Sequence, residues 1–382
     1  MNFEVKTIKD IEKLRFFHNK FDCVTIHTKK IKYRGVLHYA IKYAAWSLKK
    51  KATLLIKDNG PYEVVIRPYL ISIYQVNQCV HQFLKANVKP IKTDFDNGTL
   101  EYEVNILNSN NQDKEWSSGI IYSGSSSEVE LLNKSIIGLY NQEEFNKSNS
   151  EIVVCGPSNG DYSFLSEHPN SLRVIYVDDV SKDGRFLISK KKNILINNLK
   201  YENCILIHSR IQFEPNTLKN LNTNFEFISP QINIIEGDIK KRYIDFNHMG
   251  SYDPTRITVG KIVSSNYKPY NYLNKLKYGQ VYIDGGCMIF KRSILMKIPL
   301  NNNLAWFENE DVELASRLQN GGYLIDYAYN VLAISNTNKT KGNPYKKILS
   351  KIYFLQILLL FYIYIKSFFV NYYNRLTYFL FK

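Results

Sequence analysis

Residues Trp306–Tyr323 read WFENEDVELASRLQNGGY, and this stretch says more about fold and function than any other part of the chain. Apolar residues recur at helical spacing and end at Gly321-Gly322, where a left-handed residue would stop a helix. The start of this predicted helix is crowded with acids: Glu308, Glu310, Asp311 and Glu313. The helix dipole favours carboxylates at that position, so capping alone would explain them.

The segment upstream suggests a second role for these acids. Residues Tyr282–Arg292 read YIDGGCMIFKR, which predicts a strand, a double glycine and a further strand. Gly285 and Gly286 have no side chains, so the backbone there can approach a ligand closely. A ligand site between this turn and the acidic helix is therefore one reading, and simple helix capping is the other.

Further towards the N-terminus, apolar strands alternate with helical stretches. The predicted strands are Gly119–Tyr122, Glu151–Cys155, Arg173–Val177 and Cys204–Ile207. Continuous apolar strands separated by helices predict an α/β fold with a mainly parallel sheet covered by helices. The polar residues 109–115 form a predicted linker before this domain.

Residues 1–108 predict a smaller α/β domain with the order strand, helix, strand, helix and a closing pair of strands. This order resembles the C-terminal half of a class I methyltransferase fold. The glycine-rich turn that would hold a methyl donor after the first strand is absent. We therefore expect a docking or remnant domain, and methyl transfer is the weaker alternative.

Residues 345–382 are basic and aromatic, with an apolar core at Ile352–Ile365. As a helix this core spans only ~21 Å, less than the ~30 Å hydrocarbon layer of a bilayer. We expect a helix that lies on an anionic membrane surface, with a buried helix or a dimer contact as alternatives.

Composition limits the class of partner. The chain has 382 residues, of which 45% are hydrophobic and 22% charged, as in globular proteins with more than one domain. The net charge of +15 favours anionic partners such as nucleotides or a phospholipid surface. The lysines are dispersed and no nucleic-acid module is recognisable, so we expect no nucleic-acid partner. The sequence carries no signal of oligomeric state.

The five cysteines are scattered without a CxxC pair, which favours a reducing compartment. The N-terminus MNFEVKTIKDIEK lacks the apolar core of a signal peptide. Together with the basic tail, these features predict a cytoplasmic protein, peripheral on the inner face of the cell membrane.

The order of a double-glycine strand, a Glu-Asp pair that opens a helix, an Arg-Leu and a Gly-Gly-Tyr resembles the acceptor half of GT-A glycosyltransferases, particularly glycosyltransferase family 2. The resemblance covers residues 116–340 and implies a GT-A fold, a mixed and mainly parallel sheet. It implies that Asp311 is the catalytic base and that Glu310 helps to hold the acceptor. It also places Gly285 and Gly286 beside the acceptor.

The chemistry of such an enzyme needs a carboxylate at this place. A sugar hydroxyl is a poor nucleophile until a base takes its proton during attack on the anomeric carbon. Attack opposite a nucleoside diphosphate inverts the anomeric configuration. The start of a helix should keep Asp311 ionised. The alternative role for Asp311 is structural capping.

The resemblance implies a nucleotide-sugar donor bordered by strand ends and a helix start. The candidate donor-binding residues are Ser123, Gly124, Gly156, Asp179, Lys192, Asn193, Ser209 and Arg210. Asp179 would accept from a uracil or ribose group, or is a solvated strand end. Lys192 would face the donor phosphates, or is part of a helix surface.

The sequence departs from the family at His208-Ser209-Arg210, where GT-A enzymes usually have an acidic motif that holds a divalent ion. Ser209 stands in place of the expected aspartate, and serine is a poor ligand for Mn²⁺ or Mg²⁺. The sequence therefore specifies no metal site, and Arg210 with Lys192 would neutralise the diphosphate instead.

Two functions follow from these residues. The leading one is an inverting transferase that acts on a glycan or lipid-linked acceptor in surface polysaccharide synthesis. The alternative, motivated by Ser209, is a catalytically inactive scaffold of a polysaccharide synthesis complex.

Overall fold

The computed structural model describes residues 1–31, 34–57, 73–105, 115–146, 149–168, 172–178, 186–221, 224–236, 239–243, 246–248, 273, 281–305 and 308–337. The chain forms two compact units, Met1–Asn336 and Thr337–Lys382. The predicted membrane-associating helix in 345–382 lies outside the described residues. Among the helices that are described, none is both long and apolar enough to cross a membrane.

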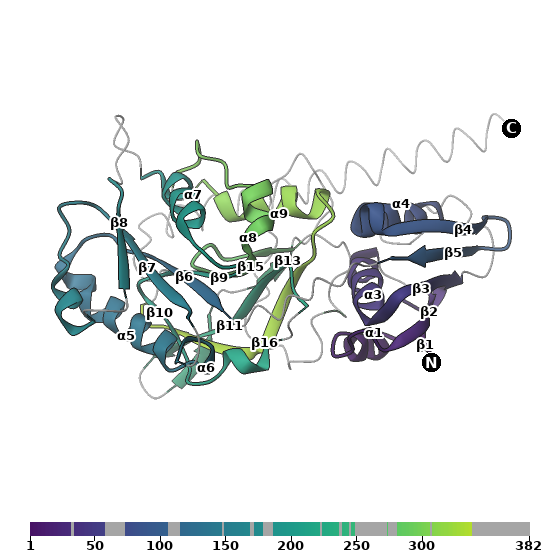
Figure 1. Cartoon of the computed structure of the whole chain (residues 1–382), viewed down its shortest axis with the longest axis horizontal. Coiled ribbons are helices and arrows are strands. Elements are labelled where there is room, and N and C mark those ends of the chain that lie inside the picture. The colour runs from purple at the N-terminus through teal and green to yellow at the C-terminus, as the bar shows by residue number, and fades with distance from the viewer. Residues whose placement is uncertain are drawn as a thin grey trace, which may run out of the picture. The chain divides into compact units, whose positions relative to one another are not determined.

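The N-terminal lobe is built on a five-stranded sheet (Figure 1). Its strands run in the order β1 (Asn2–Val5), β2 (Phe21–His27), β3 (Leu48–Lys57), β5 (Thr99–Val104) and β4 (Val88–Asp94). The first three are parallel, and β5 runs antiparallel to both of its neighbours. The helices of this lobe are α1 (Ile8–Leu14), α2 (Thr28–Ile31), α3 (Arg34–Ser47) and α4 (Ile73–Leu84).

The predicted alternation of strands and helices in this lobe is observed from β2 onwards. The structure adds β1 and α1 before it. Thr7 begins α1 with a capping box, because its side chain accepts from the Asp10 N–H while Asp10 reaches back to the Thr7 N–H. The likeness to half of a methyltransferase stays a prediction.

The larger lobe contains a mixed sheet in the order β8-β7-β6-β9-β15-β11-β16-β10, with β12 (Ile239–Arg242) paired to β11. The bounds are β8 (Leu172–Tyr176), β7 (Glu151–Gly156), β6 (Trp116–Ile121), β9 (Asn203–His208), β15 (Cys287–Lys291), β11 (Phe227–Glu236), β16 (Ile325–Ser335) and β10 (Ile211–Phe213). Strands β6 to β9 are parallel, and β11 is parallel to β16. Strand β15 runs antiparallel to both of its neighbours. This confirms the predicted α/β class and the predicted mixed, mainly parallel sheet.

Helices cover both faces of this sheet. In Figure 1, α7 (Ile188–Asn198), α8 (Arg292–Lys297) and α9 (Glu310–Asn320) lie on one side, and α5 (Val129–Tyr140) and α6 (Glu143–Asn146) lie on the other. Because both faces are covered, β6 is buried along its whole length and β9 along nearly all of it. Strands β13 (Phe246–His248) and β14 (Val281–Ile283) form a separate two-stranded antiparallel sheet, and β14 precedes the double glycine.

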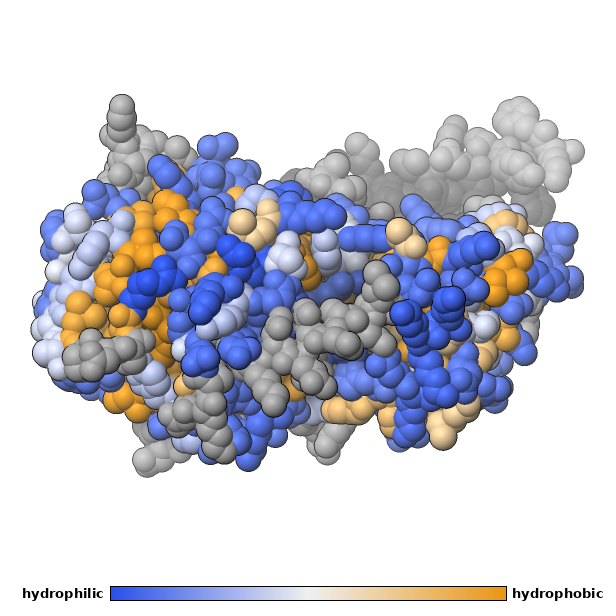
Figure 2. Space-filling model, in the orientation of Figure 1, coloured by the Kyte–Doolittle hydropathy of each residue, from blue (hydrophilic) through white to orange (hydrophobic). Residues whose placement is uncertain are grey.

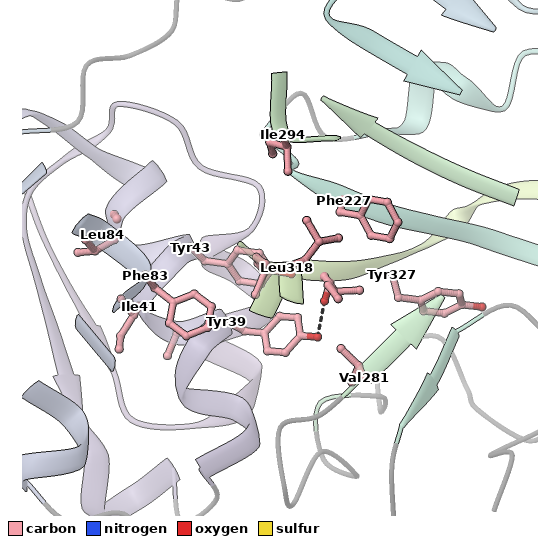
Figure 3. Packing of buried hydrophobic residues seen from close by; sticks show 14 of the residues in the cluster. Tyr39, Ile41, Tyr43, Phe83, Leu84, Phe227, Val281, Ile294, Leu318 and Tyr327 are labelled. Carbon is pink, nitrogen blue, oxygen red and sulfur yellow. Dashed lines mark hydrogen bonds between the residues drawn. The ribbon is translucent and has the colours of Figure 1, made fainter. Parts of the chain in front are cut away.

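The two sheets share one hydrophobic core, which runs from α3 and α4 into α9 and the strands behind it (Figure 3). Polar side chains cross the same contact. The Tyr39 hydroxyl donates to the Ile325 carbonyl at 2.6 Å, and the Tyr43 hydroxyl donates to Asp326 Oδ2 at 2.6 Å. Arg15 donates to the Tyr327 carbonyl at 2.7 Å. The two sheets therefore belong to a single compact unit. The predicted linker at 109–115 lies, except for Glu115, outside the described residues.

The end of α9 is held by the N-terminal lobe. Gln82 in α4 donates from Nε2 to the Gln319 carbonyl at 3.0 Å, so this carbonyl in the last turn of the helix accepts from Gln82 as well as from the Gly322 N–H at 2.9 Å. Gly322 follows in left-handed conformation with φ +76°, and a Cβ there would lie 1.9 Å from the Gln82 carbonyl oxygen. The closeness of this contact requires glycine.

The face shown in Figure 2 is mostly hydrophilic, with apolar residues gathered around β7 and β8 of the larger lobe. Tyr176, the last residue of β8, is 57% exposed and stacks edge-on against Tyr162 with ring centroids 5.2 Å apart.

Candidate active site

The start of α9 lies against the double-glycine turn between β14 and β15. The Gly285 N–H donates to Asp311 Oδ2 at 3.1 Å, and Asp311 Oδ1 accepts from the Val312 N–H at 2.9 Å. The next residue of the turn, Gly286, accepts from the His208 N–H at 3.0 Å. Since His208 ends β9, the acidic helix start meets the carboxyl ends of the parallel strands. Ligands of open α/β sheets bind at such an edge.

Both glycines of the turn are in contact with charged side chains. A Cβ at Gly285 would lie 2.9 Å from Glu310 Oε1 and 2.9 Å from Lys192 Nζ. A Cβ at Gly286 would lie 2.6 Å from Arg210 Nη2. The turn therefore requires glycine for space, because three charged groups approach its backbone directly.

Replacing Gly285 with alanine is expected to lower the free energy of unfolding by about 1–3 kcal/mol, as overpacking does in a core. The Lys192 and Glu310 side chains would have to move to admit the new methyl group. Urea denaturation measures the change. The exposed Ser316 on α9 provides a control, since its replacement by alanine should change stability by less than ~0.5 kcal/mol. Equal stability of the Gly285 variant and the wild type would contradict the crowding described here.

Lys192 and Glu310 form a buried ion pair beneath the turn. Lys192 on α7 is fully buried, and its Nζ donates to the Gly285 carbonyl at 2.8 Å and to Glu310 Oε1 at 3.1 Å. Glu310 is only 7% exposed. Removal of two charges from water is costly, so each side chain needs the other. In the structure the two side chains contact each other. The predicted places of Lys192 beside the donor and of Glu310 beside the acceptor stay predictions.

Asn193 ties α7 to the chain after α8. Its Oδ1 accepts from the Leu300 N–H at 3.0 Å, and its Nδ2 donates to the Leu300 carbonyl at 2.7 Å and to Asn302 Oδ1 at 2.7 Å. Its amide is thus engaged within the protein. These contacts give Asn193 a structural role, and the predicted contact with the donor stays a prediction.

The pKa of Asp311 is raised to about 6. Burial is the main cause, and the negative charges of Glu310 and Asp284 add to it. Lys192 and the Gly285 N–H oppose the shift. The sequence predicts that the helix start keeps this group ionised, but burial and the two neighbouring acids outweigh that effect. Since a pKa of about 6 lies below neutral pH, the Asp311 carboxyl is mostly ionised at pH 7 and can act as a base at that pH.

Arg210 lies on the other glycine of the turn and is 8% exposed. Its Nη1 is 2.9 Å from His208 Nδ1, and its Nη2 is 3.9 Å from Asp284 Oδ2. Asp284 also accepts from the Gly286 N–H at 3.1 Å. Asp284 is not among the residues predicted from the sequence, although its place directly before the double glycine would have supported it.

Ser209 contacts the carboxylate of Glu128, which is also not among the residues predicted from the sequence. The Ser209 hydroxyl donates to Glu128 Oε2 at 3.0 Å, and the Ser123 N–H lies 3.4 Å from the same oxygen. Ser123 and Ser209, two predicted donor-binding residues, are thereby brought together by Glu128. Nothing in the local sequence SSSEVE distinguishes Glu128 from a surface acid.

The residues at the end of β9 do not fit a site for Mn²⁺ or Mg²⁺. The Ser209 hydroxyl donates to Glu128, and the neighbouring side chain is the cation Arg210. Within the described ranges, no group of three or more His, Cys, Asp or Glu residues is arranged to hold a metal ion. Hard divalent ions need several oxygen ligands with carboxylates among them.

The loops after β6 and β7 pack against each other at the same edge. Gly124 has φ +86°, and a Cβ there would lie 2.5 Å from Pro157 Cγ. A Cβ at Gly156 would lie 2.6 Å from the Tyr162 hydroxyl. Both predicted glycines are therefore required by close packing between these loops. Asp179 lies outside the described residues.

No family model matches the sequence, and no curated protein matches it. Among solved structures, the chain is similar to residues 1–349 of TarS from S. aureus, with 14% identity, a TM-score of 0.36 and 58% of each chain covered. It is also similar to GalNAc-T7 with UDP, GalNAc and Mn²⁺, with 12% identity and a TM-score of 0.44. That match covers 59% of this chain and 44% of GalNAc-T7, so this chain spans less than two thirds of either protein.

Proposed function

We propose that this chain is an inverting glycosyltransferase that moves a sugar from a nucleotide-diphosphate donor to a hydroxyl group of a glycan or glycolipid. The observation that carries the proposal is the placement of Asp311. This carboxylate is fixed by the Gly285 N–H at the carboxyl edge of the parallel strands, and its pKa is raised to about 6. A base with a pKa close to the working pH is suited to accept a proton during attack.

The reaction follows from this placement. The acceptor hydroxyl oxygen attacks the anomeric carbon and forms the new glycosidic bond, while its proton passes to a carboxylate oxygen of Asp311. The bond between the anomeric carbon and the diphosphate oxygen breaks, and its electron pair leaves with the nucleoside diphosphate. Attack from the face opposite the leaving group inverts the anomeric centre.

The cellular setting of the proposal comes from the sequence. The basic, aromatic residues 345–382 suit an anionic membrane surface on the cytoplasmic side, where a lipid-linked acceptor would be held. Surface polysaccharide synthesis is the corresponding process.

Transfer is expected to slow as the pH falls through about 6, because the protonated Asp311 can no longer accept a proton. Above this range the rate should level off. The experiment screens nucleotide sugars for a rise in melting temperature, and then measures transfer from the best donor between pH 4.5 and 8.5. A rate that increased on acidification would contradict a carboxylate base.

The competing function is an inactive scaffold, suggested by Ser209 at the end of β9. Calorimetry with a panel of nucleotide sugars, in the presence and absence of Mn²⁺, separates the two. Absence of binding across the panel would favour the scaffold. Binding together with transfer would exclude it.

A further inference from the structure

We propose that Arg210 binds the diphosphate group of the donor directly, in the role that a divalent ion would otherwise have, so that donor binding requires no metal. This inference rests on the proposed function, since it concerns the same site. The chemical class of the ligand is a diphosphate, either free or within a nucleotide.

The guanidinium group of Arg210 is buried and has donors without an acceptor in the described part of the chain. Arg210 is 92% buried, yet its Nε and Nη2 have no hydrogen-bond acceptor among the residues that the structure describes. Its contacts there are Nη1 with His208 Nδ1 at 2.9 Å and the longer approach of Nη2 to Asp284 at 3.9 Å. A buried polar group without an acceptor is costly. Two open donors on one planar group match an anion with two oxygens, which arginine binds in bidentate fashion.

Two other buried cations, Lys191 and Lys192, are already hydrogen-bonded to groups of the protein. Lys192 Nζ is held by Glu310 and the Gly285 carbonyl. Lys191, also buried, donates from Nζ to the Tyr122 carbonyl at 2.7 Å. Of these three cations, Arg210 is the one whose donor atoms lack an acceptor among the described residues. A share of Lys192 in binding the diphosphate stays a prediction.

The contacts of Asp311 and Arg210 with the double-glycine turn also support the proposal. Asp311 contacts Gly285 and Arg210 contacts Gly286, two adjacent residues whose Cα atoms are ~3.8 Å apart. A base and a fixed cation thus contact adjacent residues of one turn at the carboxyl edge of the sheet. Transfer needs this pairing, because the proton leaves the acceptor as negative charge grows on the diphosphate.

The residues around Ser209 and Arg210 are a poor fit for a divalent metal ion. Ser209 replaces the expected aspartate, and its hydroxyl donates to Glu128. A divalent ion would have to share this edge with the fixed positive charge of Arg210. Guanidinium and metal are therefore alternatives, and the residues present suit the guanidinium.

The test is calorimetric titration of the full chain with inorganic pyrophosphate, and separately with UDP, in buffer containing EDTA. We expect the wild type to bind pyrophosphate without metal, and added Mn²⁺ to change the affinity by less than about threefold. Arg210→Gln should weaken binding on the order of 10- to 100-fold, as expected for loss of hydrogen bonds to a charged group. Arg210→Lys should recover part of the loss. The exposed Lys190 supplies the control, since Lys190→Gln removes one positive charge of the same chain at a solvent-exposed position.

Failure to bind pyrophosphate in EDTA would overturn the inference, as would equal affinity of Arg210→Gln and the wild type. The metal arm uses only the wild type, so it decides the question even if Arg210→Gln does not fold. Two outcomes separate this inference from the proposed function. Metal-dependent sugar transfer would retain the function and reject the Arg210 site. Arg210-dependent binding without transfer from any donor would retain the site and reject the function.

Discussion

Replacement of Asp311 by asparagine is expected to lower the rate of sugar transfer by about 10²- to 10⁴-fold, the usual contribution of a positioned general base. Asparagine keeps the size of the side chain and an oxygen that can accept from the Gly285 N–H. It has no basic carboxylate to take the proton of the acceptor hydroxyl. The donor should therefore still bind, and the loss should appear in kcat.

The same variant is expected to be more stable than the wild type at neutral pH. The Asp311 carboxyl keeps its proton to about pH 6 in the folded chain, and to ~3.9 when unfolded. The folded state binds more protons between these values, so its stability falls as the pH rises from ~4 to ~6. Asparagine removes this penalty, which is at most about 3 kcal/mol. The melting temperature should rise by a few degrees at pH 7.5 and approach that of the wild type near pH 4.

Glu313→Gln is the matched control, because Glu313 lies in the first turn of the same helix and binds Arg317 at 2.5 Å. It should leave the rate within about threefold of the wild type, in keeping with the small energy of such a pair. Near-normal transfer by Asp311→Asn would remove the base from the mechanism. An unchanged melting temperature would show that the carboxyl is not destabilised by its surroundings.

Lys192→Met should cause the largest loss of stability, about 3–5 kcal/mol, because it leaves the Glu310 carboxylate buried without its cation. Methionine has a similar length but cannot donate to the Gly285 carbonyl. The melting temperature should fall by roughly 10 °C. Thermal and urea denaturation measure both quantities.

Two further variants identify the cause of the loss. Combining Lys192→Met with Glu310→Gln removes the uncompensated charge and should recover a large part of the stability. Lys190→Met changes the exposed neighbour on the same helix and should have an effect below ~0.5 kcal/mol. If Lys192→Met melted within about 1 °C of the wild type, the ion pair would not contribute as described.

Local patterns predicted much of the fold. The helix at Glu310–Asn320 begins and ends where its acids and double glycine indicate, because capping and termination depend on neighbouring residues. The apolar runs predicted the parallel strands β6, β7 and β9, since continuous burial leaves a direct record in the sequence. Strand β8 was also predicted, although it is only partly buried. The meeting of the helix start with the sheet edge also followed, once the order of elements was known.

Contacts between segments that are distant in the sequence could not be predicted in this way. Asp284 and Glu128 acquire their significance from Arg210 and Ser209, which approach them only in the fold. Lys192 has the sequence context of a surface lysine, and its burial depends on Glu310, 118 residues further along the chain. A periodicity rule describes one element at a time and does not encode such pairs.

The contact between Gln82 and the end of α9 limits how the two lobes can change over evolutionary time. Gly322 admits no side chain beside the Gln82 carbonyl, and Gln82 binds the helix that carries Asp311. A different N-terminal lobe joined to the larger one would lack this fitted surface. The two lobes should therefore be inherited together, with substitutions at their boundary matched from one side to the other.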